Sequence, residues 1–129
     1  MPELNILENV ALPSLINGVQ SEEAFKISQE LLHNFGLNNR LYSKPSNLSG
    51  GEQQRVAIAR SLINKPKLII ADEMTGNLDE KTANSIFSFF LDQIKINKQA
   101  LIYVTHNKKY SIQAKDEYEI IQQNLIKIS

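Results

Sequence analysis

The sequence predicts an α/β fold, in which helices pack on a parallel β-sheet. Two short apolar runs, residues 68–71 and 100–105, end abruptly in polar residues, as strands buried in a parallel sheet do. A long helical pattern separates the two runs, so the order of elements is helix, strand, helix, strand. Ligands of such sheets bind at the carboxyl ends of the strands, and we therefore expect the functional residues there.

Length and composition narrow the class of protein. With 129 residues, 42% of them hydrophobic, the chain suits one packed domain rather than two. Its 14 basic and 14 acidic side chains balance, so composition gives no general attraction to nucleic acid or anionic lipid. The sequence has no cysteine, which excludes disulfides, thiolate zinc sites, iron–sulfur clusters and a thiol nucleophile. It shows neither a signal peptide nor a bilayer-spanning apolar run, and we expect a cytosolic protein.

The first third of the chain is expected to be helical. Residues 3–18 have a mixed pattern, and Pro13 should start or kink a helix rather than sit inside one. Residues 21–35 give a clearer helix, with Ser21 as its N-cap and Gly36 as its stop. The predicted apolar face of this helix comprises Ala24, Ile27, Leu31, Leu32 and Phe35.

Two further helices and a hairpin are predicted in the rest of the chain. Residues 50–64 form a helix before the first strand, and residues 118–122 and 125–128 form a terminal hairpin that turns near Asn124. The helix between the two strands has the most regular apolar stripe, at spacings of three and four residues. The expected inward residues of the two helices are Val56, Ala59, Leu62 and Ile63, then Ala83, Ile86, Phe87, Phe90, Leu91 and Ile94.

Two consecutive glycines open the helix at residues 50–64. Ser49 and Glu52 fit a capping box, in which each side chain satisfies a backbone N–H of the other residue. That box does not explain Gly50 and Gly51, because a glycine within a helix costs up to about 1 kcal/mol relative to alanine. Without side chains, these positions let a phosphate group approach the N–H groups at the positive end of the helix dipole. We therefore expect a phosphate contact at Ser49, Gly50 and Gly51.

Two acidic residues end the first predicted strand. Asp72 is suited to hold Mg²⁺, usually through water. Glu73 is suited to orient or deprotonate a water molecule for attack on a phosphorus atom. Alone, the pair also fits a solvated loop after a strand, so the functional interpretation depends on the neighbouring motifs.

A histidine ends the second predicted strand. Parallel strands place His106 at the same sheet edge as Asp72 and Glu73. A lone histidine after a strand is more often an exposed loop residue, and its position beside two acids is what favours a catalytic role. His33 lies within a predicted helix without such neighbours, and we expect it to be structural.

In their order and spacing, these segments resemble the ATPases of ABC transporters. The resemblance implies that residues 48–52 are the family's signature motif, residues 68–72 its Walker B strand and residues 77–79 its D-loop. In that family, ATP lies between the phosphate loop of one subunit and the signature motif of its partner. The site residues that the resemblance implies are the catalytic Glu73 and His106, the Mg²⁺-holding Asp72, the D-loop Asp79, and Ser49, Gly50 and Gly51, which face ATP held by a partner.

Three further runs resemble one subgroup of the family. Residues 7–10, 76–79 and 84–87 are similar to the ATP-binding subunits of lipoprotein-releasing systems and of macrolide exporters, the former above all. This resemblance implies ATP and Mg²⁺ as cofactors. It implies permease subunits and a second ABC ATPase subunit as partners, and no nucleic acid. The expected location is the cytoplasmic face of the inner membrane, where the permease would hold the subunit.

The sequence has no phosphate loop (Walker A), G-x-x-x-x-G-K-[ST]. Its five glycines are followed by valine, leucine, glycine, glutamate or asparagine, so no Gly-Lys pair exists. We expect residues 1–129 to be the C-terminal portion of one ABC ATPase domain, with a helical subdomain at about 4–64 and the Walker B strand and following elements at about 65–129. The isolated chain should then neither bind nor hydrolyse ATP appreciably. Its strands would lack neighbours, so we also expect exposed apolar surface and a marginally stable, aggregation-prone chain.

Two positions depart from the family's pattern. Met74 stands where the family usually has proline. Proline would fix the backbone there, so we expect Met74 to loosen the turn after Glu73. Gln123 and Asn124 stand where the hairpin usually has Asp-Gly. Because asparagine tolerates positive φ, we expect the second departure to have little effect.

Two other classes of function stay open. A non-catalytic interaction module, or the remnant of a decaying gene, would keep these motifs without using a nucleotide. ATPases of DNA repair and chromosome structure share the signature and Walker B motifs. This sequence has no zinc-binding cysteines, no long heptad segment and no net basic charge. These absences weigh against the ATPases of DNA repair and chromosome structure. Co-purification with an intact partner would favour the interaction module.

Overall fold

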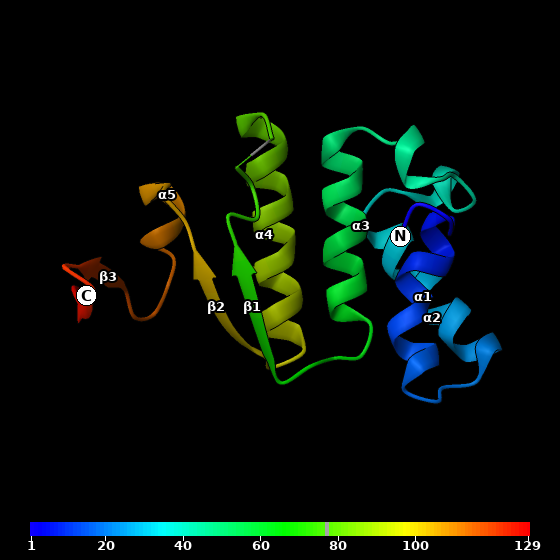
Figure 1. Cartoon of the computed structure of the whole chain (residues 1–129), viewed down its shortest axis with the longest axis horizontal. Coiled ribbons are helices and arrows are strands. Elements are labelled where there is room, and N and C mark those ends of the chain that lie inside the picture. Colours follow the sequence, from blue (N-terminus) through cyan, green and yellow to red (C-terminus); the bar gives the residue numbers. More distant parts are fainter. Residues whose placement is uncertain (77) are drawn as a thin grey trace.

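The structure, a computed structural model, describes residues 1–76 and 78–129 and confirms the predicted α/β class. Helices alone form one side of the molecule, and two small two-stranded sheets lie toward the other side (Figure 1). None of the described helices is both long and apolar enough to cross a membrane. In chain order the elements are α1 (Ile6–Ile16), α2 (Ser21–Asn34), the 3-10 turns η1 (Asn38–Arg40) and η2 (Pro45–Asn47), α3 (Gly50–Leu62), β1 (Leu68–Asp72), α4 (Glu80–Ile96), β2 (Ala100–Val104), α5 (Lys108–Ser111), β3 (Tyr118–Ile121) and β4 (Asn124–Lys127).

Helices α1, α2 and α3 bury their apolar faces against one another. Ile6, Val10, Leu32 and Ala59 are each 0% exposed, and all four lie in one continuous core. Burial of this kind, rather than helix propensity, supplies most of the stability of short helices. The four inward residues predicted for α3 are all buried, namely Val56, Ala59, Leu62 and Ile63.

Two local predictions in this region are wrong. Pro13 sits inside α1, in its last turn, where a proline removes a single helical hydrogen bond. The carbonyl of Pro13 accepts from the N–H of Asn17 at 3.2 Å and from the side chain of Asn64 at 3.1 Å, which holds the turn in place. Ser21 is the first residue of α2 rather than its N-cap, and Gln20 caps the helix without a side-chain hydrogen bond.

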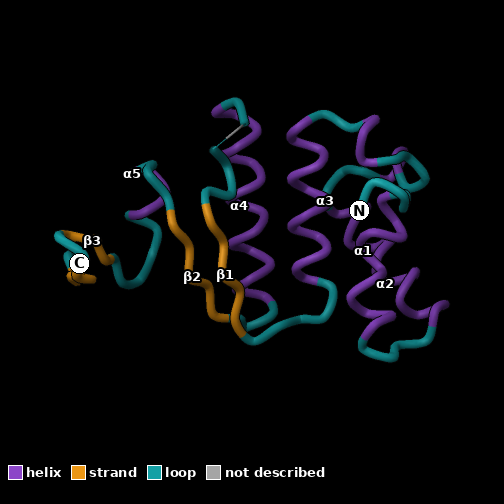
Figure 2. The backbone as a smooth tube through the Cα atoms, viewed as in Figure 1, coloured by secondary structure: helices purple, strands orange, loops and turns teal. Residues whose placement is uncertain are grey.

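Strands β1 and β2 are parallel neighbours, and α4 covers one face of the pair (Figure 2). Ile69, opposite Leu101 in the register, is 6% exposed and joins the core that α3 and α4 share. The predicted stripe of α4 is confirmed: Ala83, Ile86, Phe87, Phe90 and Ile94 are buried, and Leu91 is partly buried.

The opposite face of the β1–β2 pair is exposed and apolar. Leu68 is 47% exposed, Ile70 72%, Ile102 57% and Val104 54%. Successive side chains of a strand point to opposite faces, and in the described residues a helix covers only one of these faces. The expectation of buried strands therefore holds for one face only, and the expected exposed apolar surface is confirmed on the other.

Strands β3 and β4 form the predicted antiparallel hairpin at the C-terminus. The two turn residues are Gln122 (φ 47°) and Gln123 (φ 66°), and Ile121 pairs with Asn124. The turn thus lies near Asn124, as predicted, and Asn124 itself is the first residue of β4. Two consecutive positive φ angles match the twist of a two-residue hairpin, although asparagine and glycine are the usual residues there.

Candidate functional site

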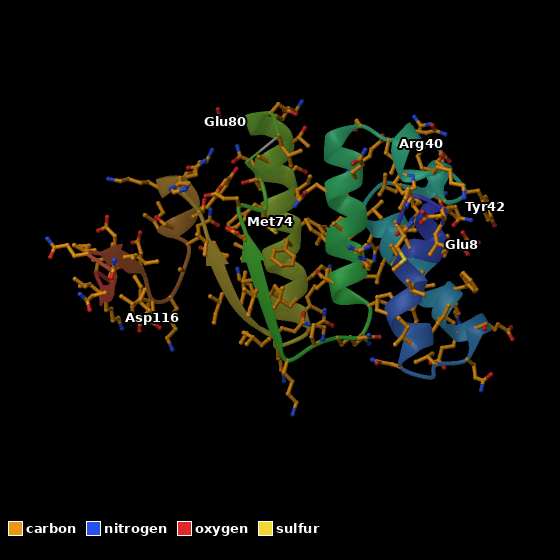
Figure 3. All side chains as sticks on the ribbon, in the orientation of Figure 1. Glu8, Arg40, Tyr42, Met74, Glu80 and Asp116 are labelled. Carbon is orange, nitrogen blue, oxygen red and sulfur yellow. The ribbon has the colours of Figure 1, made fainter. Side chains whose placement is uncertain are left out.

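The carboxyl ends of β1 and β2 and the first turns of α3 and α4 all face one edge of the molecule, the upper edge in Figure 1. Figure 3 labels Glu80, the first residue of α4, and Arg40, near the start of α3, along this edge. Every residue that the sequence analysis singles out for chemistry belongs to one of these four segment ends. The topology thus gathers them without placing them all in contact.

Glu73 and His106 are in contact across the ends of the two parallel strands. The backbone N–H of His106 donates a hydrogen bond to Oε1 of Glu73 at 3.1 Å. The Nε2 atom of His106 lies 3.4 Å from the same oxygen. The N–H of Glu73 donates to the carbonyl of Val104 at 3.1 Å, which ties the turn to the end of β2. The expectation that these two residues meet at one sheet edge is confirmed.

The backbone of Glu73 lies in the left-handed region, with φ at 43°. This conformation is uncommon for a residue with a side chain and is often found at turns and functional sites. The carbonyl of Glu73 accepts from the N–H of Gly76 at 3.1 Å. Met74 is partly buried and packs against two groups of core residues, the main core and a smaller cluster of Ala83, Phe87 and Tyr110. These apolar contacts hold the turn at the position where proline is usual (Figure 3).

Glu73 and His106 line an open pocket of about 600 Å³. The remaining lining residues follow β1, begin α4 or follow β2. The carboxylates and the histidine of the pocket can exchange a proton, and its lysine can contact an anionic ligand. These other residues are Thr75, Gly76, Leu78, Glu80, Ala83, Thr105, Asn107, Lys108 and Tyr110.

Asp72 lies next to this pocket but does not line it. It is the last residue of β1, it pairs with Val104 in the register, and it is exposed. The described residues contain no cluster of three or more histidines, cysteines or acids that could hold a metal ion. A single carboxylate still suits Mg²⁺, which keeps several waters and usually takes its other oxygens from phosphates.

The capping box predicted at the start of α3 is confirmed. The N–H of Glu52 donates to Oγ of Ser49 at 3.2 Å, and the N–H of Ser49 donates to Oε2 of Glu52 at 2.8 Å. That backbone N–H of Ser49 is the main cause of the lowered pKa of the Glu52 carboxyl, and Arg40, 3.6 Å away, lowers it further. The box fixes the first turn of α3 and leaves Ser49 exposed at its tip.

The two glycines of this turn have different surroundings. A Cβ atom on Gly51 would lie 3.3 Å from Cγ2 of Thr82 and 3.7 Å from Cδ2 of Leu78. Gly51 therefore allows α3 to approach the beginning of α4. A Cβ atom on Gly50 would meet nothing within 4 Å. No steric reason for glycine at position 50 exists within the described residues, so the open side of this turn is accessible to a ligand or another chain.

Asp79 caps α4 and lies outside the pocket. Its side chain accepts a hydrogen bond from the N–H of Thr82 at 3.0 Å, and hydrogen bonding with Thr82 is the main cause of the lowered pKa of Asp79. The predicted D-loop spans residues 77–79, and Asn77 lies outside the described residues.

Sequence reasoning missed two tyrosines that pack against Phe87, one of which, Tyr110, lines the pocket. Tyr110 is 3% exposed, and its hydroxyl donates to Oδ1 of Asn84 at 3.0 Å. The hydroxyl of Tyr103 donates to the carbonyl of Tyr110 at 2.6 Å, and Phe87 packs against both rings. Burial, with Glu117 nearby, raises the pKa of Tyr103. The available signal was a lone aromatic residue in an otherwise polar stretch after β2.

Comparison with known proteins decides the family. The sequence pattern described as ABC transporter matches residues 1–76, more than half of the chain. The chain belongs to the ABC transporter family. Among family members, the lipoprotein-releasing system ATP-binding protein LolD of Rickettsia bellii (strain RML369-C) is 52% identical over 107 residues, which cover 83% of this chain and 48% of that protein. LolD of Hydrogenovibrio crunogenus (strain DSM 25203 / XCL-2) is 45% identical over 126 residues, which cover 98% and 55%.

Solved structures of ABC transporter cassettes share the fold. The dimeric structure of MJ0796, a bacterial ABC transporter cassette, matches with a TM-score of 0.81 and 36% identity, over 92% of this chain and 53% of that one. A post-hydrolysis state of MJ0796 bound to ADP and Pi also matches with a TM-score of 0.81, at 35% identity. The chain spans about half the length of the curated relatives it matches.

Proposed function

We propose that this chain acts within an ATP-binding subunit of a lipoprotein-releasing ABC transporter, which uses ATP to energise a membrane permease. The observation that carries the proposal is the contact between Glu73 and His106 at the carboxyl ends of two parallel strands. The identity of about half of the aligned residues with LolD proteins supports the subgroup. The partners are permease subunits and a second ABC ATPase subunit, and the permease holds the chain at the cytoplasmic face of the inner membrane.

Glu73 is the proposed catalytic base in the pocket. Its Oε1 accepts the N–H of His106, so Oε2 is the atom left to orient a water molecule and take its proton. His106 positions that carboxylate through its backbone and faces the same oxygen with its ring. Mg²⁺, held by Asp72 through water, would neutralise charge on the phosphates of ATP.

The first turn of α3 is the proposed contact with ATP held by a partner subunit. Ser49 is exposed at the tip of this turn, Gly50 has an open side, and Gly51 follows. Backbone N–H groups at the start of a helix favour a phosphate group. Asp79 accepts a hydrogen bond from the N–H of Thr82, whose Cγ2 lies beside Gly51, so this cap helps to hold the start of α4 next to the turn.

The isolated 129-residue chain is proposed to be inactive. It has no Gly-Lys pair, and a phosphate loop needs that lysine and its glycine-rich backbone to hold β- and γ-phosphates. The chain therefore needs a phosphate loop from elsewhere. Calorimetry should detect no ATP binding by the purified chain, and Mg²⁺-dependent turnover by it would refute this part of the proposal.

A composite-site experiment tests the role of the α3 turn. The purified chain is mixed with full-length Rickettsia bellii LolD in which the signature serine has been replaced. We expect ATP hydrolysis to rise, because the relative supplies the phosphate loop and this chain supplies Ser49, Gly50 and Gly51. The Ser49→Arg variant should give no rise, since a large cation would fill the open first turn.

The Glu73→Gln variant is the matched control. In the composite site the relative supplies both the phosphate loop and its own catalytic glutamate, so this variant should restore hydrolysis to the same extent as the unchanged chain does. Equal rescue by Ser49→Arg would exclude the proposed contact. The contact would also be excluded if neither the unchanged chain nor Glu73→Gln restored hydrolysis while a pull-down showed that the two chains associate.

A further inference from the structure

A second groove lies away from the candidate site, between the end of α2, α3 and the first half of α4. Its volume is about 420 Å³, and it shares no lining residue with the pocket around Glu73. Its lining combines two cations, Arg55 and Lys81, with aromatic side chains and with the hydroxyls of Thr82 and Ser85. Nothing in the sequence analysis or in the proposed function uses this surface.

The cationic side of the groove has an unsatisfied donor. The Nε atom of Arg55 is buried and has no hydrogen-bond partner among the described residues. Its guanidinium is held beside the chain at Gly36, where an added Cβ would lie 3.7 Å from one terminal nitrogen. Lys81, exposed in the first turn of α4, forms no ion pair within the described part of the chain. Because buried donors are nearly always paired, a carboxylate that enters this side of the groove would supply the acceptor that Arg55 lacks. Within the chain, the Arg55 charge acts on Glu52 of the same helix, which does not line the groove.

The other side of the groove is apolar. The rings of Phe35 and Phe89 meet edge to face, with centroids 4.5 Å apart. Ile86, from the same side of α4 as Phe89, also lines the groove and is 3% exposed. No acidic residue is among the lining residues that the structure describes. The groove thus presents positive charge next to an aromatic surface.

We propose that this groove docks an acidic segment of a partner protein, with a carboxylate on Arg55 and an adjacent apolar side chain on the Phe35–Phe89 pair. A guanidinium pairs with a carboxylate through two parallel hydrogen bonds, and Lys81 adds a second charge at the rim. Thr82 and Ser85 offer hydroxyls to the backbone of an extended peptide. A free inorganic anion fits less well, because it would leave the aromatic side uncovered. This inference goes beyond the proposed function and does not depend on it.

Peptide titration of the full chain tests the proposal. The probe is acetyl-Glu-Glu-Phe-Leu-Glu-Glu-amide, followed by NMR shifts of the ¹⁵N-labelled chain, and the neutral control replaces each Glu with Gln. We expect the acidic peptide to shift the amides around Arg55 and Phe89 and to bind at least about tenfold more tightly than the neutral one. Arg55→Gln should weaken binding about tenfold, Arg55→Lys less, and Lys81→Gln about threefold.

Arg60→Gln is the matched control, because Arg60 is an exposed arginine of α3 that does not line the groove. Circular dichroism checks that each variant folds, and Arg55→Lys keeps the test valid if Arg55→Gln does not fold. The proposal is wrong if the neutral peptide binds equally or if neither peptide binds. It is also wrong if Arg55→Lys and Lys81→Gln match the unchanged chain, or if inorganic phosphate causes the same shifts with similar affinity.

Discussion

The helical part of the molecule and its strands differ in how they bury apolar side chains. In α1, α2 and α3, residues such as Ile6 and Leu32 are completely buried. In β1 and β2, Ile70 and Ile102 are 72% and 57% exposed, although both strands are as apolar in sequence as the helices. The hairpin strands β3 and β4 are exposed at every position. An apolar segment thus gains free energy on burial, but the neighbouring elements decide whether its side chains are buried.

A core truncation should give the largest difference between the two regions. Leu32→Ala removes a side chain that is 0% exposed, and we expect it to lower the free energy of unfolding by about 2–5 kcal/mol. The matched variant Ile70→Ala, on the exposed face of β1, should change it by no more than about 0.5 kcal/mol. Urea unfolding followed by circular dichroism measures both. Similar losses for the two variants would contradict the contrast.

The two glycines of α3 should respond in opposite directions. Gly50→Ala should raise the free energy of unfolding by roughly 0.5 kcal/mol, because the added methyl meets nothing. Gly51→Ala should lower it by about 1 kcal/mol, because the methyl presses on Cγ2 of Thr82. Adding Thr82→Ser removes that carbon and should restore the loss. If Gly51→Ala is neutral, the close approach of α3 to α4 does not limit position 51.

The Glu52 capping box should give a smaller, pH-dependent effect. Hydrogen bonding to Ser49 lowers the pKa of Glu52 below 4.5 in the folded chain. The carboxylate therefore stabilises the fold above about pH 4.5, and this contribution is lost as the pH falls through the lowered pKa. Unfolding curves of the chain and of Glu52→Gln, from pH 7 down to pH 3, should converge at low pH. If the free energies of unfolding of the two chains differ by the same amount at every pH, protonation of Glu52 does not affect stability.

The hairpin turn should show the smallest effect. Gln123 has φ at 66°, which glycine adopts without strain, so Gln123→Gly should stabilise the hairpin by about 0.5 kcal/mol. Amide exchange at the β3–β4 pairs, such as Tyr118 with Lys127, is the readout. Asn124→Gly is the control, since Asn124 lies in β4 and gains nothing from glycine. Faster exchange in Gln123→Gly would contradict the described turn.

Periodicity explains which parts of the fold were predictable. The stripe of α4 repeats at three and four residues, so Ile86, Phe87 and Phe90 are identified without any knowledge of their neighbours. The same information does not show that one face of β1 stays uncovered, because that depends on which elements pack there. Pro13 is the opposite case: a strong local rule is overridden, because the core contacts of α1, such as those of Ile6 and Val10, hold the helix together despite the lost hydrogen bond.

The candidate site divides in the same way. The meeting of Glu73 and His106 was predictable because parallel strands bring their carboxyl ends to one edge. The packing role of Gly51 was not, since it depends on Thr82 in a different helix. Tyr110 was missed because a single buried tyrosine in a four-residue helix produces no repeat.

The left-handed backbone of Glu73 has a consequence for the choice of variants. β-Branched residues such as valine and isoleucine fit positive φ poorly, so their failure at this position would report the backbone and not the lost carboxylate. Asparagine and glycine accept the conformation, and glutamine keeps the length of the side chain. Comparing Glu73→Gln with Glu73→Val therefore separates two kinds of loss, one chemical and one conformational. A mutational scan of position 73 therefore reports two requirements at once, one for the carboxylate and one for a backbone with positive φ.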